Sequence, residues 1–81
     1  MTITIRCFAG LRDCASADGR RVNLADGATA AEAWAALVRA FPALEPWGTC
    51  VRPAVNRAYV PWRTALHHGD ELALIPPVSG G

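Results

Sequence analysis

Two stretches near the start of the chain alternate apolar and polar residues, which is typical of β-strands with one buried face. In residues 2–8, Ile3, Ile5 and Cys7 fall on one face, and residues 20–24 repeat the alternation. The residues between the two stretches are mostly of turn-forming types and end in an Asp-Gly pair. The pattern therefore predicts two successive strands joined by a turn, as in a β-hairpin.

An amphipathic pattern over residues 29–42 predicts one long helix. Thr29 can cap its first turn, and Glu32 stands three residues later, which is the spacing of a capping box. Apolar residues then recur at intervals of three and four, as on one face of a helix. They are Trp34, Leu37, Val38 and Phe41. We expect this stripe to face the core and Pro42 to end the helix.

A loop through Pro46-Trp47-Gly48 and three short strands are predicted in the second half of the chain. The strands are residues 52–55, 58–60 and 71–75, with an irregular segment at 62–68 before the last of them. Asn56-Arg57 is predicted to form a tight turn between the first two. The order of elements is then two strands, a helix and three strands. One helix packed across a mixed sheet of about five strands gives an α+β domain of two layers.

The chain ends in IPPVSGG, a sequence that is unsuited to pairing in a sheet. Proline has no N–H to donate, so Pro76-Pro77 should end the last strand. Glycine has no side chain, so Gly80 and Gly81 can pass through a narrow channel. Six residues at about 3.3–3.6 Å each can reach roughly 20 Å. We therefore expect a folded domain at residues 1–75 and a protruding tail at residues 76–81.

Composition excludes several classes of protein. A chain of 81 residues has room for one small domain, and 52% hydrophobic with 19% charged residues excludes intrinsic disorder. The net charge is +1, and the eight basic residues, all arginines, do not form a basic cluster. Nucleic acid and membrane surfaces are therefore not expected as partners. Because lysine is absent, the chain cannot accept an isopeptide bond on a lysine of its own.

The residues with metal-binding or nucleophilic side chains show no catalytic pattern. Cys7, Cys14 and Cys50 form no CxxC pair, and no secretory signal precedes them. We expect a cytoplasmic protein whose free thiols are buried as small hydrophobes. His67-His68 is interpreted as a polar turn, because adjacent histidines point apart and no third ligand has a zinc-like spacing. Asp70-Glu71, beside Gly69 at the start of a strand, is interpreted as a solvated turn and not as an acid/base pair, with an interface contact near the tail as the alternative. No metal site is predicted, and without a glycine-rich phosphate loop we expect no bound cofactor.

Three stretches of the sequence resemble the small subunit of molybdopterin synthase, the MoaD family of sulfur carriers. They are GDELALIPPVSGG at residues 69–81, FAGLRD at residues 8–13 and AVNRAYV at residues 54–60. The resemblance extends over the whole chain, and the tail is its most specific part. It implies the β-grasp, or ubiquitin-like, fold and a role in molybdenum cofactor biosynthesis.

The resemblance also implies a reaction and partners. In that family, an adenylyltransferase related to ubiquitin-activating enzymes uses ATP to activate the terminal carboxylate, here Gly81. A sulfur donor then converts it into a thiocarboxylate. The charged tail enters the large subunit of molybdopterin synthase, where two sulfur transfers convert cyclic pyranopterin monophosphate into molybdopterin. The assembly is a heterotetramer with two large subunits at its centre. The small subunit supplies the reacting sulfur, and the catalytic side chains belong to the large subunit.

Two sets of site residues follow from the resemblance. The residues predicted to thread into the partner ahead of Gly81 are Pro76, Pro77, Val78, Ser79 and Gly80. The residues predicted to bind the partner's surface are Phe8, Arg12, Tyr59 and Ile75. The family more often carries an aliphatic residue at the position of Tyr59 and an aromatic one at that of Ile75. The alternative interpretation makes the three apolar residues ordinary core and Arg12 a solvated loop residue.

Three other functions use the same features. A carrier for thiamin thiazole would share the chemistry, although such carriers tend to be shorter and lack the Pro-Pro-Val before the glycines. A protein modifier would join Gly81 to lysines of target proteins. A plain β-grasp interaction module would carry the tail without using it. Sulfur loaded onto Gly81 would separate the carriers from the interaction module.

Overall fold

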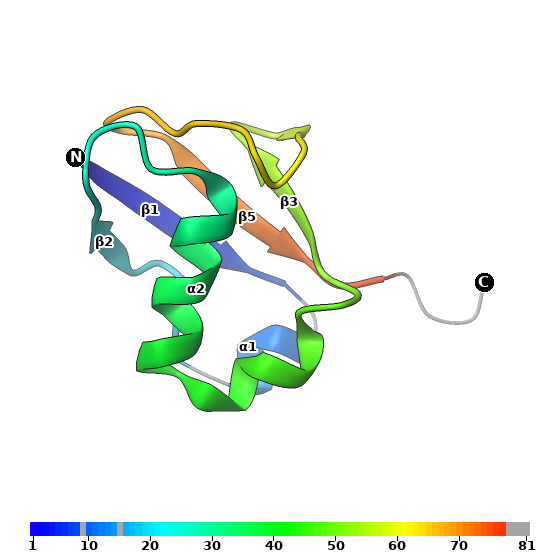
Figure 1. Cartoon of the computed structure of the whole chain (residues 1–81). Coiled ribbons are helices and arrows are strands. Elements are labelled where there is room, and N and C mark those ends of the chain that lie inside the picture. The colour runs from blue at the N-terminus through cyan, green and yellow to red at the C-terminus, as the bar shows by residue number, and fades with distance from the viewer. Residues whose placement is uncertain (9, 15, 78–81) are drawn as a thin grey trace.

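Five strands form one mixed sheet, and the longest helix lies across one of its faces (Figure 1). This computed structural model describes residues 1–8, 10–14 and 16–77, with the backbone alone at Asp13 and Cys14. The strands are β1 (Thr2–Cys7), β2 (Arg21–Asn23), β3 (Arg52–Val55), β4 (Ala58–Tyr59) and β5 (Glu71–Ile75). The helices are α1 (Gly10–Cys14), α2 (Ala30–Ala40) and the 3₁₀ helix η1 (Pro42–Trp47).

The strands follow the order β2-β1-β5-β3-β4 across the sheet. The central pair, β1 and β5, is parallel, although these strands are the first and the last along the chain. All other neighbouring strands are antiparallel. The α+β fold predicted from the sequence, with a five-stranded mixed sheet and one main helix, is confirmed.

The face of the sheet beneath α2 forms the hydrophobic core, and we call it the inner face. Ile3, Ile5 and Cys7 of β1 are at most 1% exposed, as their alternation predicts. Leu72 and Leu74 of β5 lie beside them and are completely buried. A domain of this size has little other apolar surface to bury, so these few side chains supply much of its stability.

The predicted capping box of α2 is present. The Oγ1 atom of Thr29 accepts a hydrogen bond from the N–H of Glu32, and the Oε1 atom of Glu32 accepts one from the N–H of Thr29, both at 3.2 Å. The N–H of Ala30 donates to the carbonyl of Thr64 at 2.9 Å. The first turn is therefore held both by its own side chains and by the loop before β5.

The apolar stripe of α2 faces the core only in part. Leu37 is buried, as predicted, together with the two alanines Ala30 and Ala33. The bulkier members of the stripe pack at the margin of the core, where they are half-buried: Trp34, Val38 and Phe41. The alanines occupy the centre because small side chains allow the helix to approach the sheet closely.

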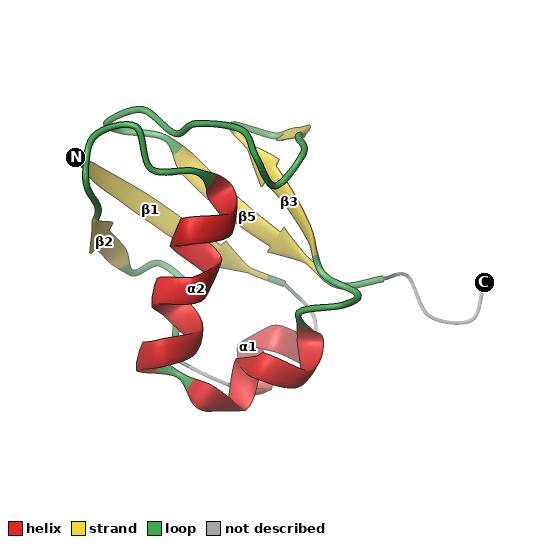
Figure 2. Cartoon of the chain, viewed as in Figure 1, coloured by secondary structure: helices red, strands yellow, loops and turns green. Residues whose placement is uncertain are grey.

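Two segments predicted to be turns or loops are short helices (Figure 2). The β1–β2 connection contains α1, so these strands pair antiparallel without forming a tight hairpin. The residues after α2 form η1 instead of an open loop. Each helix buries one leucine completely, Leu11 or Leu44. One leucine per segment gives no recognisable period, so the sequence pattern does not reveal these helices.

The tight turn predicted at Asn56-Arg57 is confirmed. Both residues have positive φ angles, 50° and 73°, which is the backbone of a type I′ turn. This turn joins β3 to β4, so that Ala54 pairs with Tyr59.

Among the described residues, no helix has the length and apolar character needed to cross a lipid bilayer.

Candidate functional site

The last strand brings the chain to one end of the sheet. β5 lies between β1 and β3 and stops at Ile75. Pro76 is buried and Pro77 is exposed, and neither can donate a hydrogen bond to a neighbouring strand. The remaining residues of the predicted site, Val78, Ser79, Gly80 and Gly81, lie outside the described residues. The structure therefore defines the base of the tail and the surface around it.

The face of the sheet away from α2, which we call the outer face, carries a row of four residues in register. Arg6 of β1 pairs with Ala73 of β5, Ala73 with Ala54 of β3, and Ala54 with Tyr59 of β4. Tyr59 is 65% exposed, whereas the two alanines between Arg6 and Tyr59 are nearly covered. Because the two alanines are small and lie between the larger Arg6 and Tyr59, the surface has a depression in the middle of this row.

An apolar surface surrounds this low point. Phe8 follows the last residue of β1 and is 42% exposed, as expected for the strand face opposite Ile3, Ile5 and Cys7. Ile75 ends β5 and is half-buried. Together with the row they border a hollow of about 300 Å³. We call the apolar residues of this surface the outer patch: Phe8, Ala54, Tyr59, Ala73 and Ile75.

A second hollow, of about 260 Å³, connects the outer patch to the base of the tail. It is lined by Arg52, Tyr59, Ile75, Pro76 and Pro77. Tyr59 and Ile75 therefore belong to both hollows. A partner that covers the outer patch would also contact the residues from which the tail starts.

Arginines surround the outer patch. Arg6 and Arg57 line the first hollow, and Arg52 lines the second. The guanidinium carbon of Arg6 lies 6.0 Å from the centre of the Phe8 ring, within cation–π distance. One carboxylate, that of Glu71, also lines the first hollow, with its Oε2 atom 3.9 Å from Nη1 of Arg6. The excess of positive charge suits a partner surface that places carboxylates around an apolar centre.

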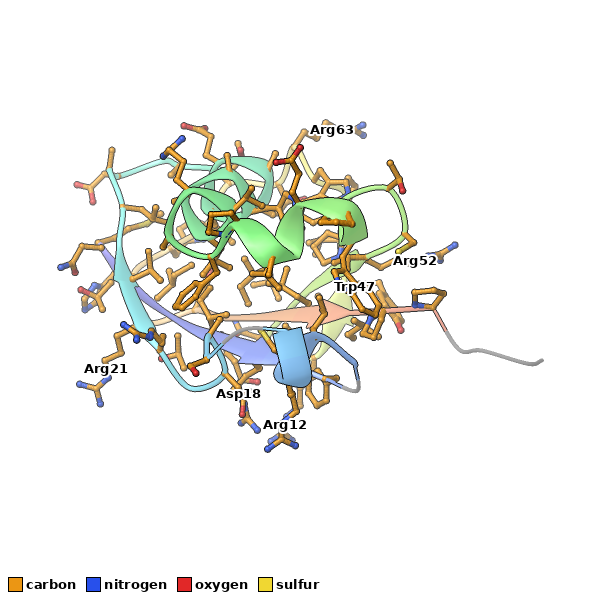
Figure 3. The ribbon with its side chains drawn as sticks, turned by 90° about the horizontal axis from the view of Figure 1, so that it is seen from below. Arg12, Asp18, Arg21, Trp47, Arg52 and Arg63 are labelled. Carbon is orange, nitrogen blue, oxygen red and sulfur yellow. The ribbon has the colours of Figure 1, made fainter. Side chains whose placement is uncertain are left out.

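Asp18 connects two arginines, Arg6 and Arg12, to the end of β1. Its Oδ1 atom accepts hydrogen bonds from the N–H of Cys7 at 2.9 Å and from Nε of Arg6 at 3.2 Å. Its Oδ2 atom lies 3.8 Å from Nη2 of Arg12 (Figure 3). The bond from Cys7 chiefly holds the pKa of Asp18 below its ordinary value; desolvation opposes this, and Arg6 and Arg12 add to it. Asp18 thus fixes the strand end from which Phe8 projects.

The role of Asp18 was missed by sequence reasoning, which assigned the residue to a turn. On the edge of β1 that faces β2, the backbone bonds continue to Ile5, whose N–H donates to the carbonyl of Arg20, so the N–H of Cys7 needs another acceptor. The Asp18 carboxylate supplies it at Cys7. Arg12, predicted as a partner-binding residue, stands at the same corner on α1 with its side chain 62% exposed. No spacing in the sequence signals this contact, because the turn brings these residues together only in the folded chain.

The indole ring of Trp47, at the end of η1, packs against Gly10 at the start of α1. A Cβ atom added to Gly10 would lie 2.8 Å from the Cη2 atom of Trp47, so the ring rests directly on the glycine. The carbonyl of Trp47 also accepts the N–H of Val51 at 2.9 Å, just before β3. Figure 3 places Trp47 on the side of the molecule where the tail begins. This contact fixes the position of α1, and with it Arg12, relative to the base of the tail.

The histidine pair takes part in local hydrogen bonds. Nδ1 of His68 accepts the N–H of Thr2 at 3.0 Å, and the N–H of His67 donates to Oδ2 of Asp70 at 2.8 Å. These bonds close the polar turn before β5. Within residues 1–8, 10–14 and 16–77, no group of three or more histidine, cysteine, aspartate or glutamate side chains is placed to hold a metal ion.

Of the two cysteines whose side chains the structure describes, one is buried, as predicted, and the other is exposed, contrary to the prediction. Cys7 lies in the core, where burial, and to a lesser extent the charge of Asp18, raises the pKa of its thiol. Cys50 is exposed, because it lies in the turn between η1 and β3, with its Sγ atom 3.4 Å from the carbonyl of Trp47. The side chain of Cys14 lies outside the described residues.

The mixed sheet, the helix across it and the parallel pairing of the first and last strands define a β-grasp, or ubiquitin-like, protein. The structure of SAMP1 from Haloferax volcanii matches with a TM-score of 0.89 and 36% identity over the full length of both chains. A complex of subunits 1 and 2 of the molybdopterin-converting factor from Helicobacter pylori contains a chain that matches with a TM-score of 0.72. That chain is 23% identical over the full length of both, which supports the fold alone.

The chain belongs to the ThiS family, whose model matches residues 5–81. A molybdopterin synthase sulfur carrier subunit from Chlamydomonas reinhardtii is 40% identical to it over the full length of both proteins. A protein of the same name from Arabidopsis thaliana is 35% identical, covering 98% of this chain and 82% of the relative. The resemblance to sulfur carriers found in the sequence is thereby confirmed.

Proposed function

We propose that this chain is the sulfur carrier subunit of a molybdopterin synthase and that Gly81 carries the sulfur. The observation that supports it most strongly is full-length similarity to a protein of that name at 40% identity. The sequence ends in the Gly-Gly pair that the chemistry requires, after two prolines that stop the sheet. The ThiS family match extends to the last residue, Gly81.

The reaction begins with activation of a carboxylate that is otherwise a poor electrophile. The Gly81 carboxylate attacks the α-phosphate of ATP, pyrophosphate leaves, and an acyl-adenylate forms. A sulfide equivalent attacks the carbonyl carbon, AMP leaves, and a thiocarboxylate remains. A partner of the adenylyltransferase class binds the ATP. The sulfur is then a nucleophile on a chain end without a side chain, which can enter another protein's active site.

The outer patch and the base of the tail form the docking surface of this carrier. The two hollows share Tyr59 and Ile75, so docking and insertion of the tail use one continuous surface. The partner is the large subunit of molybdopterin synthase, which contributes the catalytic side chains for sulfur transfer to cyclic pyranopterin monophosphate. The two relatives named molybdopterin synthase sulfur carrier subunit support this class of partner. The proposed compartment is the cytoplasm, where ATP is present and the exposed Cys50 thiol stays reduced.

A second candidate function is protein modification. The SAMP1 structure, 36% identical over its whole length, belongs to a protein described as a small archaeal modifier. In this role the acyl-adenylate would react with a lysine amine of a target instead of with sulfide. Copies of this chain could not be such targets through a lysine side chain, since the sequence contains none.

Intact-mass spectrometry distinguishes the two functions. The chain is incubated with an adenylyltransferase of this class, ATP and sodium sulfide, and the same mixture is prepared with a Gly81 deletion. A mass increase equal to exchange of one oxygen for sulfur, mapped to Gly81 and absent from the deletion, supports the carrier. Adding the large subunit and the pterin precursor then tests molybdopterin formation. Lysine adducts on other proteins without any sulfur exchange would instead support the modifier.

A further inference from the structure

The strand β2 is a free edge of the sheet, at the end opposite the tail base (Figure 1). In the part of the chain that the structure describes, β2 has a neighbour on one side alone, β1. Arg20 and Leu24 form backbone hydrogen bonds with β1, and Val22, midway between them, is paired with Ile3 in the same register. In an antiparallel ladder the intervening residues direct their N–H and C=O groups to the other side. The backbone groups of Arg21 and Asn23 therefore point away from the sheet.

A groove of about 440 Å³ runs between this edge and α2. Its lining residues are Arg20, Arg21, Val22, Asn23, Ala36, Leu37, Ala40 and Phe41. The groove stays open because the helix presents small side chains, Ala36 and Ala40, toward it. Val22, Leu37 and Phe41 make its surface mainly apolar, so side chains of about the size of valine could be buried there.

The charges at the groove are all positive. Arg20 is held at one end, with its guanidinium carbon 5.2 Å from the centre of the Phe41 ring and its Nε donating to the carbonyl of Ser16 at 3.1 Å. Arg21 points away from α2, on the outer face (Figure 3). Among the described residues, no carboxylate lies within ion-pair distance of either arginine, and none lines the groove.

We propose that the β2 edge binds an extended segment of a partner protein in which apolar and acidic residues alternate. Such a segment would add a sixth strand by bonding to the free N–H and C=O groups of Arg21 and Asn23. Because alternate side chains of a strand point to opposite faces, its apolar residues would enter the groove above Leu37. Its acidic residues would stand on the outer face beside Arg21.

Two other arrangements fit the edge less well. A second copy of the chain, paired through β2, would bring the arginines of both copies together without a carboxylate, and like charges across strands are unfavourable. The opposite edge, β4, has two residues and is soon followed by Pro61, which cannot donate to a ladder. The β2 edge and a separate acidic partner are therefore the better match.

The location of this edge gives the interaction a specific use. The tail base follows β5, and the outer patch is formed by the end of β1 and by β3, β4 and β5, so a strand added beside β2 covers neither. The carrier could then be held near its enzymes while its tail is loaded and emptied. Binding at β2 is inferred from the strand edge, the groove and the arginines and is independent of the sulfur chemistry; its use in holding the carrier rests on the proposed function.

A nuclear magnetic resonance titration of the full chain tests the proposal. The probe is a synthetic peptide of about ten residues that alternates valine and glutamate, and the control peptide carries lysine in place of glutamate. We expect saturable shifts at the amides of Arg21 and Asn23, slower hydrogen exchange at both, and roughly tenfold weaker binding of the lysine peptide. No saturable shifts, or equal binding of the two peptides, would overturn the proposal.

Two pairs of variants test the hydrogen bonds and the charge separately. Asn23→Pro removes the side chain and the outward N–H, whereas Asn23→Ala removes the side chain and keeps the N–H. We expect Asn23→Pro to abolish peptide binding and Asn23→Ala to retain it. Arg21→Glu should lower the affinity for the glutamate peptide roughly threefold to tenfold. Arg63→Glu, at an exposed arginine that does not line the groove, should leave that affinity unchanged. Circular dichroism confirms the fold of each variant. Binding that survives Asn23→Pro, or concentration-dependent dimers through β2 in sedimentation, would refute the partner segment.

Discussion

The inner and outer faces of the sheet are made by the same strands but are fixed by different requirements. In β5, Leu72 and Leu74 point to the inner face and are completely buried. Ala73 and Ile75, from the same strand, border the outer patch. Burial beneath a helix requires large apolar residues at every second position, and the inner face has them. Nothing in folding requires a tyrosine that is 65% exposed, and the outer face has Tyr59.

This difference separates stability from recognition within one small domain. The inner face determines whether the chain folds, because it holds five of the eight largest fully buried side chains of the described residues. The outer face determines what the folded chain can bind, since its hollows lead to the base of the tail. α1 and the turn at Asp18 join the two faces. Substitutions at four positions can test this division, beginning with the one that should affect stability most.

Leu74→Ala should cause the largest loss of stability. It leaves a cavity beneath α2, and such changes cost about 2–5 kcal/mol. Ile75→Ala is the matched control, because the neighbouring residue lies half-buried on the outer face and should cost less than half as much. Urea unfolding followed by circular dichroism gives both free energies. Equal losses would contradict the division between the faces.

Gly10→Ala should cost about 1–3 kcal/mol, because the new methyl group would overlap the ring of Trp47 and displace it. A double-mutant cycle with Trp47→Leu identifies the cause: if the ring is responsible, the alanine should be far less costly in the leucine background. The measurement is the free energy of unfolding for the four proteins. Additive effects would show that the ring of Trp47 is not the cause of the loss.

The inner face was predictable from the sequence, because burial produces a period. The alternation of Ile3, Ile5 and Cys7 identified β1, and the capping box at Thr29 identified the start of α2; both are confirmed. α1 and η1 were not predictable, since each is short and buries a single leucine. Their stability comes from contacts such as that between Gly10 and Trp47, which join segments far apart in the sequence.

The outer face was predictable only through resemblance to a family. The sequence suggested Phe8, Tyr59 and Ile75 as partner-binding residues, and the structure places them around one hollow. Their binding of a partner stays a prediction. Asp18 could not be found in this way, because its bonds to Cys7 and Arg6 depend on how the turn folds back onto β1. A carboxylate that serves a strand edge leaves no local pattern.

Asp18→Asn should lower stability at neutral pH and should also make stability less dependent on pH in acid. The folded-state pKa of Asp18 is below 3.8, its unperturbed value, so the charged carboxylate stabilises the fold above that pH. This contribution is lost as the pH falls from 3.8 through the lower folded-state pKa. The variant should therefore show a shallower decline of melting temperature in that range. Glu45→Gln, at an exposed carboxylate of η1, is the control and should follow the parent chain.

Tyr59→Ala should have the smallest effect on stability and a large effect on binding. The side chain is mostly exposed at the edge strand β4, so the free energy of unfolding should change by less than about 0.5 kcal/mol. Exposed aromatic residues at the centre of an interface often dominate its affinity, so binding of the large subunit should weaken roughly tenfold to a hundredfold. Tyr59→Leu keeps the patch apolar and should recover much of this loss. Calorimetric titration and urea unfolding of the same preparations give both quantities. Unchanged affinity in Tyr59→Ala would exclude the outer patch as the docking surface, even if sulfur still loads onto Gly81.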